Sequence, residues 1–284
     1  MYPFSIGVML ESFRLPIPEA LKKAHEVGAA GIQAYATYGD LAPEKLTAQD
    51  RKNLLDMVKS EGLVFSAICG DLGKGFHNKD LNPELIERSK RIMELAKDLE
   101  TDIVTTHIGV VPTDRSNPRY DIMQDACFRL AEAADSMEAH FAIETGPETA
   151  ETLKGFLDGL HSRGVAVNLD PANLVMVTGD DPVKAVYTLR DYIVHTHAKD
   201  GKQLYRRDPE VVYGLANGDV PVGPSFLEVA LGTGQVDFPG WLKALDDIGY
   251  KGFLTIEREV GDDPTGDIRM AADFLAERIK KYSL

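Results

Sequence analysis

The sequence predicts a single (β/α)8 barrel, and three observations lead to that fold class. Short apolar runs typical of buried strands alternate with longer segments of helical periodicity, and eight such pairs follow one another. Strands separated by helices pair in parallel, and eight of them close into a barrel more readily than they form an open sheet. The length of 284 residues is close to the roughly 250 residues of such barrels. No Pro/Ser-rich linker divides the chain, so we expect one domain over residues 1–284.

The first four strand–helix pairs are predicted from apolar runs and helical periodicity. The run at 5–10 precedes a helix at 18–27, which Gly28 ends. The other three pairs are a strand at 31–35 with a helix at 48–60, a strand at 63–69 with a helix at 84–99, and a strand at 102–107 with a helix at 121–137.

The last four pairs follow the same pattern, with strands at 141–144, 165–170, 192–197 and 253–257 and helices at 148–162, 182–190, 238–248 and 266–281. Two connections are unusually long, at 109–119 and at 198–236. The second is rich in Gly and Pro and directly follows the seventh strand. Long connections at this end of a barrel usually form lids or substrate walls. A solvated surface excursion is the alternative.

Composition excludes several classes of protein. No apolar stretch approaches the roughly 20 residues of a membrane span, and the first residues lack the basic segment and cleavage site of a signal peptide. Cys69 and Cys127 are too few for a disulfide framework, so we expect a cytoplasmic protein. The net charge of −14 comes without a basic cluster, which argues against nucleic acid and favours a small neutral or modestly charged substrate. The oligomeric state stays open, a homo-oligomer included.

Four strands carry a carboxylate or an imidazole at or near their C-terminal tip. These residues are Glu144, Asp170, His197 and Glu257, on the fifth to eighth strands. Any one of them alone would fit a surface carboxylate or a hydrogen-bonded core histidine. Since burying such groups without a partner is costly and active sites lie at the C-terminal ends of barrel strands, we expect the four to share one divalent metal ion. Mn²⁺, Mg²⁺, Co²⁺ or Zn²⁺ suits these donors, and the carboxylate majority favours a harder ion.

Other polar residues near the strand ends are candidates for substrate contacts. His195 points to the same face as His197 but lies deeper, where it either orients a carboxylate or is a hydrogen-bonded core histidine. His107 ends the fourth strand and could contact a substrate hydroxyl, bind a second metal or simply pack. Lys199 and Arg206 could bind substrate or be solvated.

The motifs around these residues resemble the xylose-isomerase-like barrel superfamily and, within it, the sugar phosphate isomerase/epimerase group. That group includes ketose 3-epimerases, inosose isomerases and dehydratases, and endonuclease IV. The resemblance spans nearly the whole chain and rests on the segments Ile143-Glu-Thr145, Asn168-Leu-Asp-Pro-Ala-Asn173, His195-Thr-His-Ala-Lys-Asp200 and Thr255-Ile-Glu-Arg-Glu259.

The resemblance implies roles for particular residues. It places the metal ligands at the four strand ends, and makes Glu144 and Glu257 the pair that removes and returns a proton through a cis-enediolate. Asn173 departs from the family pattern, because relatives often have His there. Asn173 can still hydrogen-bond a substrate hydroxyl but is a poorer metal ligand. Further ligands of the nuclease's three-zinc centre are missing, which favours one metal ion.

The sequence therefore predicts a divalent-metal-dependent sugar isomerase or epimerase, with Mn²⁺ preferred, acting on a ketose or polyol by proton transfer next to a carbonyl. A dehydratase using the same site is the close alternative, because proton abstraction followed by loss of a β-hydroxyl gives a lyase. An endonuclease-like DNA repair enzyme and a non-catalytic metal-dependent binding protein are more distant ones. The sugar, and whether it is phosphorylated, stay open.

Overall fold

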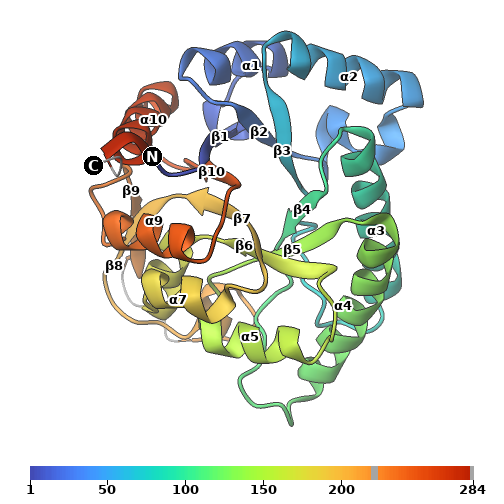
Figure 1. The fold of residues 1–284 in the computed structure, drawn as a ribbon. Coiled ribbons are helices and arrows are strands. Elements are labelled where there is room, and N and C mark those ends of the chain that lie inside the picture. The colour runs from blue at the N-terminus through green and yellow to red at the C-terminus, as the bar shows by residue number, and fades with distance from the viewer. Residues whose placement is uncertain (219–222, 282–284) are drawn as a thin grey trace.

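A computed structural model describes residues 1–218 and 223–281 and shows a closed barrel of eight parallel strands (Figure 1). Around the barrel the strand order is β1-β10-β7-β6-β5-β4-β3-β2. The predicted (β/α)8 fold is thereby confirmed. The barrel strands are β1 (Ser5–Met9), β2 (Gly31–Tyr35), β3 (Val64–Cys69), β4 (Ile103–Thr106), β5 (His140–Glu144), β6 (Val165–Leu169), β7 (Ile193–Ala198) and β10 (Phe253–Ile256).

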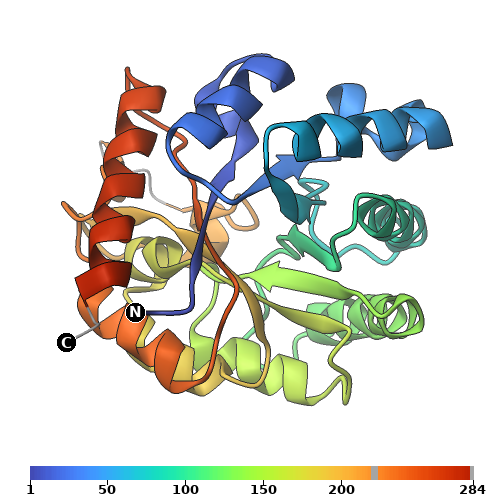
Figure 2. The ribbon, with the colours of Figure 1, turned by 45° about the horizontal axis from the view of Figure 1, so that its top comes forward.

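Helices form a layer outside the strands, as Figures 1 and 2 show from two directions. Each helix turns an apolar face to the barrel, so that large side chains such as Phe141, Phe156 and Trp241 are fully buried. Among the described helices none is long and apolar enough to cross a membrane. The main helices are α1 (Ile17–Glu26), α2 (Ala48–Ser60), α3 (Asn82–Asp98), α4 (Pro118–Met137), α5 (Ala150–Asp158), α7 (Pro182–Leu189), α9 (Phe238–Asp247) and α10 (Pro264–Lys281).

The helix expected at 148–162 is shorter than predicted. It begins at Ala150, where Thr149 caps it, and ends at Asp158 before Gly159. His161 then takes a positive φ of 50°, which a helix does not allow. The remaining helices agree with the sequence prediction to within a few residues.

The long connection at 198–236 contains secondary structure that the sequence did not predict. It holds α8 (Pro209–Val212) and an antiparallel pair, β8 (Asp200–Gln203) with β9 (Phe226–Val229). The predicted loop includes residues 219–222, which lie outside the described residues. We call the connection after β7 the arm. Asp200 holds it in place, because the buried Asp200 carboxylate accepts the backbone N–H groups of four residues at 2.8–3.2 Å: Gly201, Gly232, Gly234 and Val236. The described part of the connection is therefore a folded wall.

Candidate metal centre and active-site cavity

The predicted ligands lie on four strands that are neighbours in the barrel. Glu144 is the last residue of β5, and Asp170 directly follows β6. His197 is the penultimate residue of β7, and Glu257 directly follows β10. Because β5, β6, β7 and β10 are consecutive around the ring, their C-terminal ends bring the side chains together at one point of the rim.

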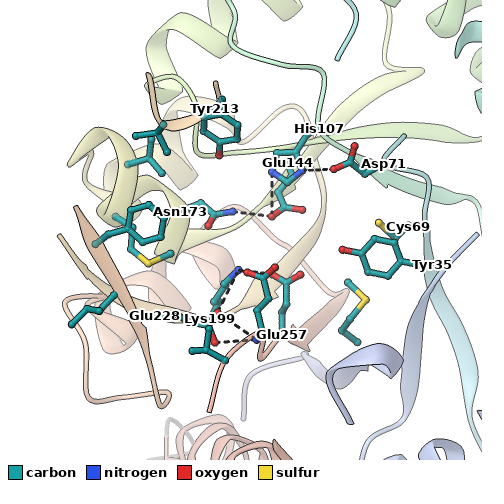
Figure 3. A pocket seen from close by; sticks show the side chains of 18 residues that line it. Tyr35, Cys69, Asp71, His107, Glu144, Asn173, Lys199, Tyr213, Glu228 and Glu257 are labelled. Atoms are coloured by element: carbon teal, nitrogen blue, oxygen red, sulfur yellow. Dashed lines mark hydrogen bonds and ion pairs between the residues drawn. The ribbon is translucent and has the colours of Figure 1, made fainter. Parts of the chain in front are cut away.

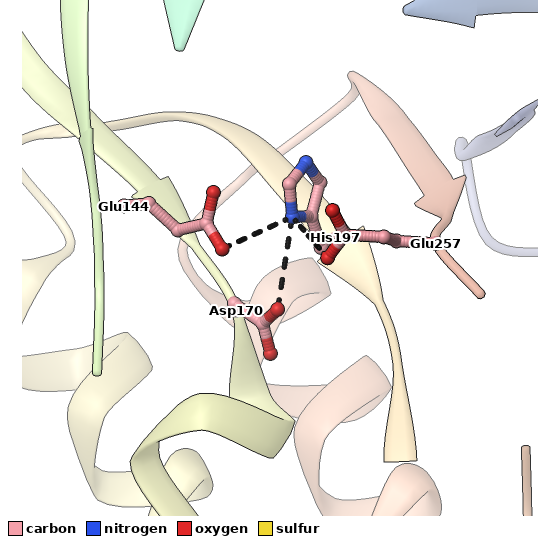
Figure 4. Close-up of side chains that lie close together, drawn as sticks. All are labelled: Glu144, Asp170, His197 and Glu257. Carbon is pink, nitrogen blue, oxygen red and sulfur yellow. Dashed lines mark ion pairs between the residues drawn. The ribbon is translucent and has the colours of Figure 1, made fainter. Parts of the chain in front are cut away.

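The four side chains converge closely enough to bind one ion. One donor atom from each lies within 4.8 Å of the others (Figure 4). His197 Nδ1 stands among three carboxylate oxygens, at 3.5 Å from Glu144, 3.6 Å from Asp170 and 3.4 Å from Glu257. Burial alone would lower the pKa of His197, but the carboxylates, led by Glu144, outweigh it and raise that pKa well above its ordinary value. A proton on Nδ1 thus occupies the place where a metal cation would balance the carboxylates.

Asp170 is held in a conformation that leaves one oxygen free. Its Oδ1 accepts the backbone N–H groups of Ala172 and Asn173 at 2.7 and 2.9 Å, at the start of the short turn α6 (Pro171–Asn173). Its Oδ2 is buried and has no hydrogen-bond partner among the described residues. A buried carboxylate oxygen without a partner is costly. The free Oδ2, directed at His197 Nδ1, therefore fits a divalent metal ion as its missing partner.

The barrel interior beneath the cluster orients His197. Gln33, fully buried on β2, places its Oε1 3.1 Å from Nε2 of His197 and 3.0 Å from Nε2 of His195. Asn168 Nδ2 lies 3.2 Å from the same Nε2, so Gln33 and Asn168 together hold the ring with Nδ1 turned towards the carboxylates. Supporting hydrogen bonds of this kind fix the orientation of metal-binding histidines. Gln33 was not anticipated from the sequence.

The predicted substrate contact His195 lies in this interior layer. Its side chain is 1% exposed, and its Nε2 lies 2.9 Å from the hydroxyl of Thr255. Burial and the neighbouring His197 lower its pKa well below the ordinary value, so it is neutral. His195 is not among the residues that line the cavity.

Glu257 forms an ion pair with a buried lysine, Lys199. Lys199 is 4% exposed, and its Nζ lies 3.0 Å from Glu257 Oε2 and 3.9 Å from Glu228 Oε2, with Glu259 also in contact (Figure 3). Burial alone would lower the pKa of Lys199, but its acidic neighbours, led by Glu257, raise it well above the ordinary value. Glu257 responds in the opposite direction: burial would raise its pKa, yet Lys199 and His197 bring it well below the usual range. Glu257 is therefore ionised.

Glu144 has different neighbours. Asn173 donates an amide hydrogen to Glu144 Oε1 at 2.8 Å, and His107 Nε2 lies 3.7 Å from the same oxygen. The other nitrogen of His107 is 3.1 Å from Asp71 Oδ2. Burial opposes a charge on His107, but Glu144 and Asp71 together raise its pKa to about 9. Gly146 permits this arrangement, because a Cβ there would lie 2.6 Å from Cβ of Asn173.

Glu144 and Glu257 of the cluster line a cavity of about 620 Å³ that Figure 3 shows. Of the predicted substrate contacts, His107, Asn173 and Lys199 line it. The exposed Arg206 lines a separate pocket of about 390 Å³. The arm after β7 contributes Tyr213, whose ring centroid lies 6.2 Å from that of His107. Burial, reinforced by Glu144, raises the pKa of Tyr213, so its hydroxyl keeps its proton.

The cavity residues not anticipated from the sequence include Tyr35, Asp71 and Tyr213, and the sequence carried a signal for the first two. Tyr35 ends β2, and Asp71 stands two residues after the end of β3. The rule that selected the four metal ligands, a polar residue at a strand C-terminus, applies equally to these two. Tyr213 had no such signal, because it lies on the arm and reaches the cavity only through tertiary structure.

The fold and these strand-end residues define a family. The chain belongs to the xylose isomerase-like TIM barrel family, whose model matches residues 21–278. Among curated proteins it is 24% identical over 210 residues to an uncharacterised protein of Methanocaldococcus jannaschii, covering 69% of this chain and 64% of that protein. A rhizopine catabolism protein of Rhizobium meliloti is 29% identical over 140 residues (48% and 41% of the two chains). An inosose dehydratase of Lacticaseibacillus casei is 25% identical over 136 residues (46% and 43%). The matches thus span less than two thirds of these relatives.

Solved structures share the fold over nearly the whole length. A xylose isomerase domain protein from Planctomyces limnophilus has a TM-score of 0.79 at 24% identity, with 99% of this chain and 97% of that chain covered. A probable 3-DHS dehydratase from Bacillus anthracis (96% and 99% covered, 19% identity) and a D-tagatose 3-epimerase-like protein (99% and 100%, 18% identity) both have a TM-score of 0.74. The fold is thus common to proteins named as dehydratases and as epimerases.

Proposed function

We propose that this protein is a divalent-metal-dependent sugar isomerase or epimerase that transfers a proton at the carbon next to a carbonyl group. The observation that carries the proposal is the convergence of Glu144, Asp170, His197 and Glu257, with Asp170 Oδ2 lacking a hydrogen-bond partner among the described residues. The three-carboxylate, one-imidazole set favours Mn²⁺. A bound ion of this kind polarises the carbonyl oxygen of a substrate and acidifies the adjacent C–H group.

The protein's own groups supply the proton transfers. Glu144 and Glu257 lie on either side of the cluster, on β5 and after β10, and both line the cavity. In our proposal one carboxylate removes the proton from one face of the substrate carbon and the other returns a proton to the opposite face. Asp170 and His197 hold the ion, while the Asn173 amide and the Tyr213 hydroxyl orient substrate hydroxyl groups. His107 and Lys199 keep the two glutamates in place, and family membership with epimerase-like neighbours supports this assignment.

Exchange of substrate hydrogen with solvent tests the proposal. The Mn²⁺-loaded protein is incubated in heavy water with a panel of ketoses, and deuterium incorporation is followed by NMR. We expect incorporation at the carbon next to the carbonyl, a loss of about 100-fold or more in Glu257→Gln, and retained Mn²⁺ by elemental analysis. Glu94→Gln, on the exposed face of α3, is the matched control. Normal exchange by Glu257→Gln removes Glu257 from the proton-transfer pair, and no exchange with any ketose refutes the isomerase proposal.

One observation favours a dehydratase as the second candidate. His107 carries a proton near neutral pH and lies beside Glu144, so an acid is available to protonate a departing hydroxyl group. Proton abstraction followed by that departure gives an unsaturated product and water. The same incubations distinguish the two reactions, because a dehydratase product has lost the mass of water whereas an isomerase or epimerase product has the mass of its substrate.

A further inference from the structure

A side cleft opens from the active-site cavity behind Glu257. It has a volume of about 220 Å³ and shares Met9, Tyr35, Glu257 and Glu259 with the main cavity. Because four residues line both spaces, the cleft adjoins the main cavity. A ligand that extends from the metal centre past these residues would enter the cleft.

Two tyrosines form one wall of the cleft. The ring centroids of Tyr35 and Tyr38 lie 5.5 Å apart with an angle of 34° between the ring planes. Tyr38 is 60% exposed, whereas large aromatic side chains are usually buried. The face of an aromatic ring is electron-rich, so it attracts the positively polarised C–H groups that line one face of a sugar ring. The exposed Tyr38, packed against the half-buried Tyr35 beside a sugar-processing centre, provides such a surface.

The polar groups of the cleft are suited to hydroxyl groups rather than to an anion. Glu11 Oε1 accepts the backbone N–H of Tyr35 at 2.9 Å, while its Oε2 is buried and has no partner among the described residues, so Glu11 shapes the wall of the cleft without offering a free acceptor. Both arginines of the cleft are engaged. Arg14 donates to the carbonyl oxygens of Gly261 and Glu259 at 2.8 and 2.9 Å. Arg258 is paired with Glu228 and Asp267. The cleft thus offers the exposed carboxylate of Glu259 as an acceptor for hydroxyl donors and, within the described part of the chain, no arginine without a partner for a phosphate or carboxylate.

We infer that this cleft, named here the Tyr35/Tyr38 subsite, binds a second, uncharged sugar ring attached to the sugar at the metal centre. The inference rests on the proposed function and deepens it, since it makes the substrate a neutral glycoside of at least two sugar units. The second ring stacks one face on Tyr38 and leaves its other face in water, as the open cleft allows. Hydroxyl groups of that ring donate to the carboxylate of Glu259, which is 57% exposed.

Binding measurements on the Mn²⁺-loaded protein test the subsite without requiring turnover. The probes are cellobiose, maltose and sucrose, each compared with glucose and fructose by calorimetry. We expect at least one disaccharide to bind roughly three- to tenfold more tightly than either monosaccharide, the range expected of one aromatic contact. Tyr38→Ala should abolish that advantage without changing monosaccharide affinity, and Tyr38→Phe, which keeps the ring, should retain it. Tyr187→Ala, at an exposed tyrosine on α7, is the matched control.

The results separate the subsite from the proposed function. The inference is overturned if no disaccharide binds more tightly than the monosaccharides, or if Tyr38→Ala keeps the advantage. A disaccharide advantage that depends on Tyr38, in a protein that exchanges no substrate hydrogen, would support the subsite and refute the isomerase proposal. Exchange of hydrogen on monosaccharides, with no tighter binding of any disaccharide, would support the isomerase proposal and refute the subsite.

Discussion

Glu148 is a buried acid whose proton should make stability fall as pH rises. Its side chain is 6% exposed, Oε2 accepts the Val111 N–H at 3.2 Å, and Oε1 has no partner among the described residues. Burial raises its pKa from 4.5 to about 8, against smaller opposing contributions from Val111 and His107. Because the folded-state pKa is the higher one, the contribution to stability is complete below pH 4.5 and is lost as pH rises through about 8. At about 1.4 kcal/mol per pH unit, the free energy of unfolding lost between pH 4.5 and about 8 amounts to about 5 kcal/mol.

Glu148→Gln isolates this effect. The glutamine oxygen can still accept the Val111 N–H, but the side chain no longer titrates. We expect the free energy of unfolding, measured with urea, to be similar for wild type and variant near pH 5. As the pH rises to about 8, the variant should become more stable than wild type by about 1.4 kcal/mol for each pH unit. Glu132→Gln, at an exposed position on α4, should show no such trend. A difference between Glu148→Gln and wild type that stays constant from pH 5 to 9 would refute the reasoning.

Two further predictions concern the surroundings of the metal cluster. Gln33→Ala removes the acceptor at Nε2 of His197 and should weaken Mn²⁺ binding about 10- to 100-fold, measured by competition with a chelator, while Gln49→Ala on the surface of α2 should not. Lys199→Met leaves the buried carboxylate of Glu257 without its lysine partner, while Glu228 keeps Arg258, and should lower the free energy of unfolding by about 3 kcal/mol. Because Mn²⁺ would restore part of the missing positive charge, it should recover part of that loss in thermal unfolding; equal losses with and without Mn²⁺ would contradict this account.

The barrel and the convergence of the four candidate metal ligands were predictable because both depend on local sequence patterns. Alternation of apolar runs with helical periodicity specifies the eight units, and parallel pairing then brings the strand ends to one face. Glu144, Asp170, His197 and Glu257 could be placed by counting strands, since the β5-β6-β7-β10 neighbourhood follows from chain order.

The rest of the site depends on contacts between residues distant in sequence. Gln33 reaches His197 across the barrel interior, a separation of 164 residues, and a single glutamine in an apolar strand gives no local sign of that role. Tyr213 enters the cavity because Asp200 ties the arm after β7 to backbone groups more than 30 residues away. Turn chemistry in a Gly- and Pro-rich connection does not specify where such an arm packs.

In our proposal the strand ends determine the chemistry, whereas the connections between strands and helices determine which substrate binds. The strand ends hold the candidate metal ligands, both glutamates among them, so in this proposal the capacity for proton transfer next to a carbonyl depends on the barrel itself. The side walls come from connections: β9 contributes Phe226 and Leu227, and the segment after β2 contributes Tyr38. Connections tolerate change far better than barrel strands do. Replacing a wall residue should therefore alter which sugar binds while Mn²⁺ binding persists, and replacing a strand-end carboxylate should impair metal binding or proton transfer for every sugar alike.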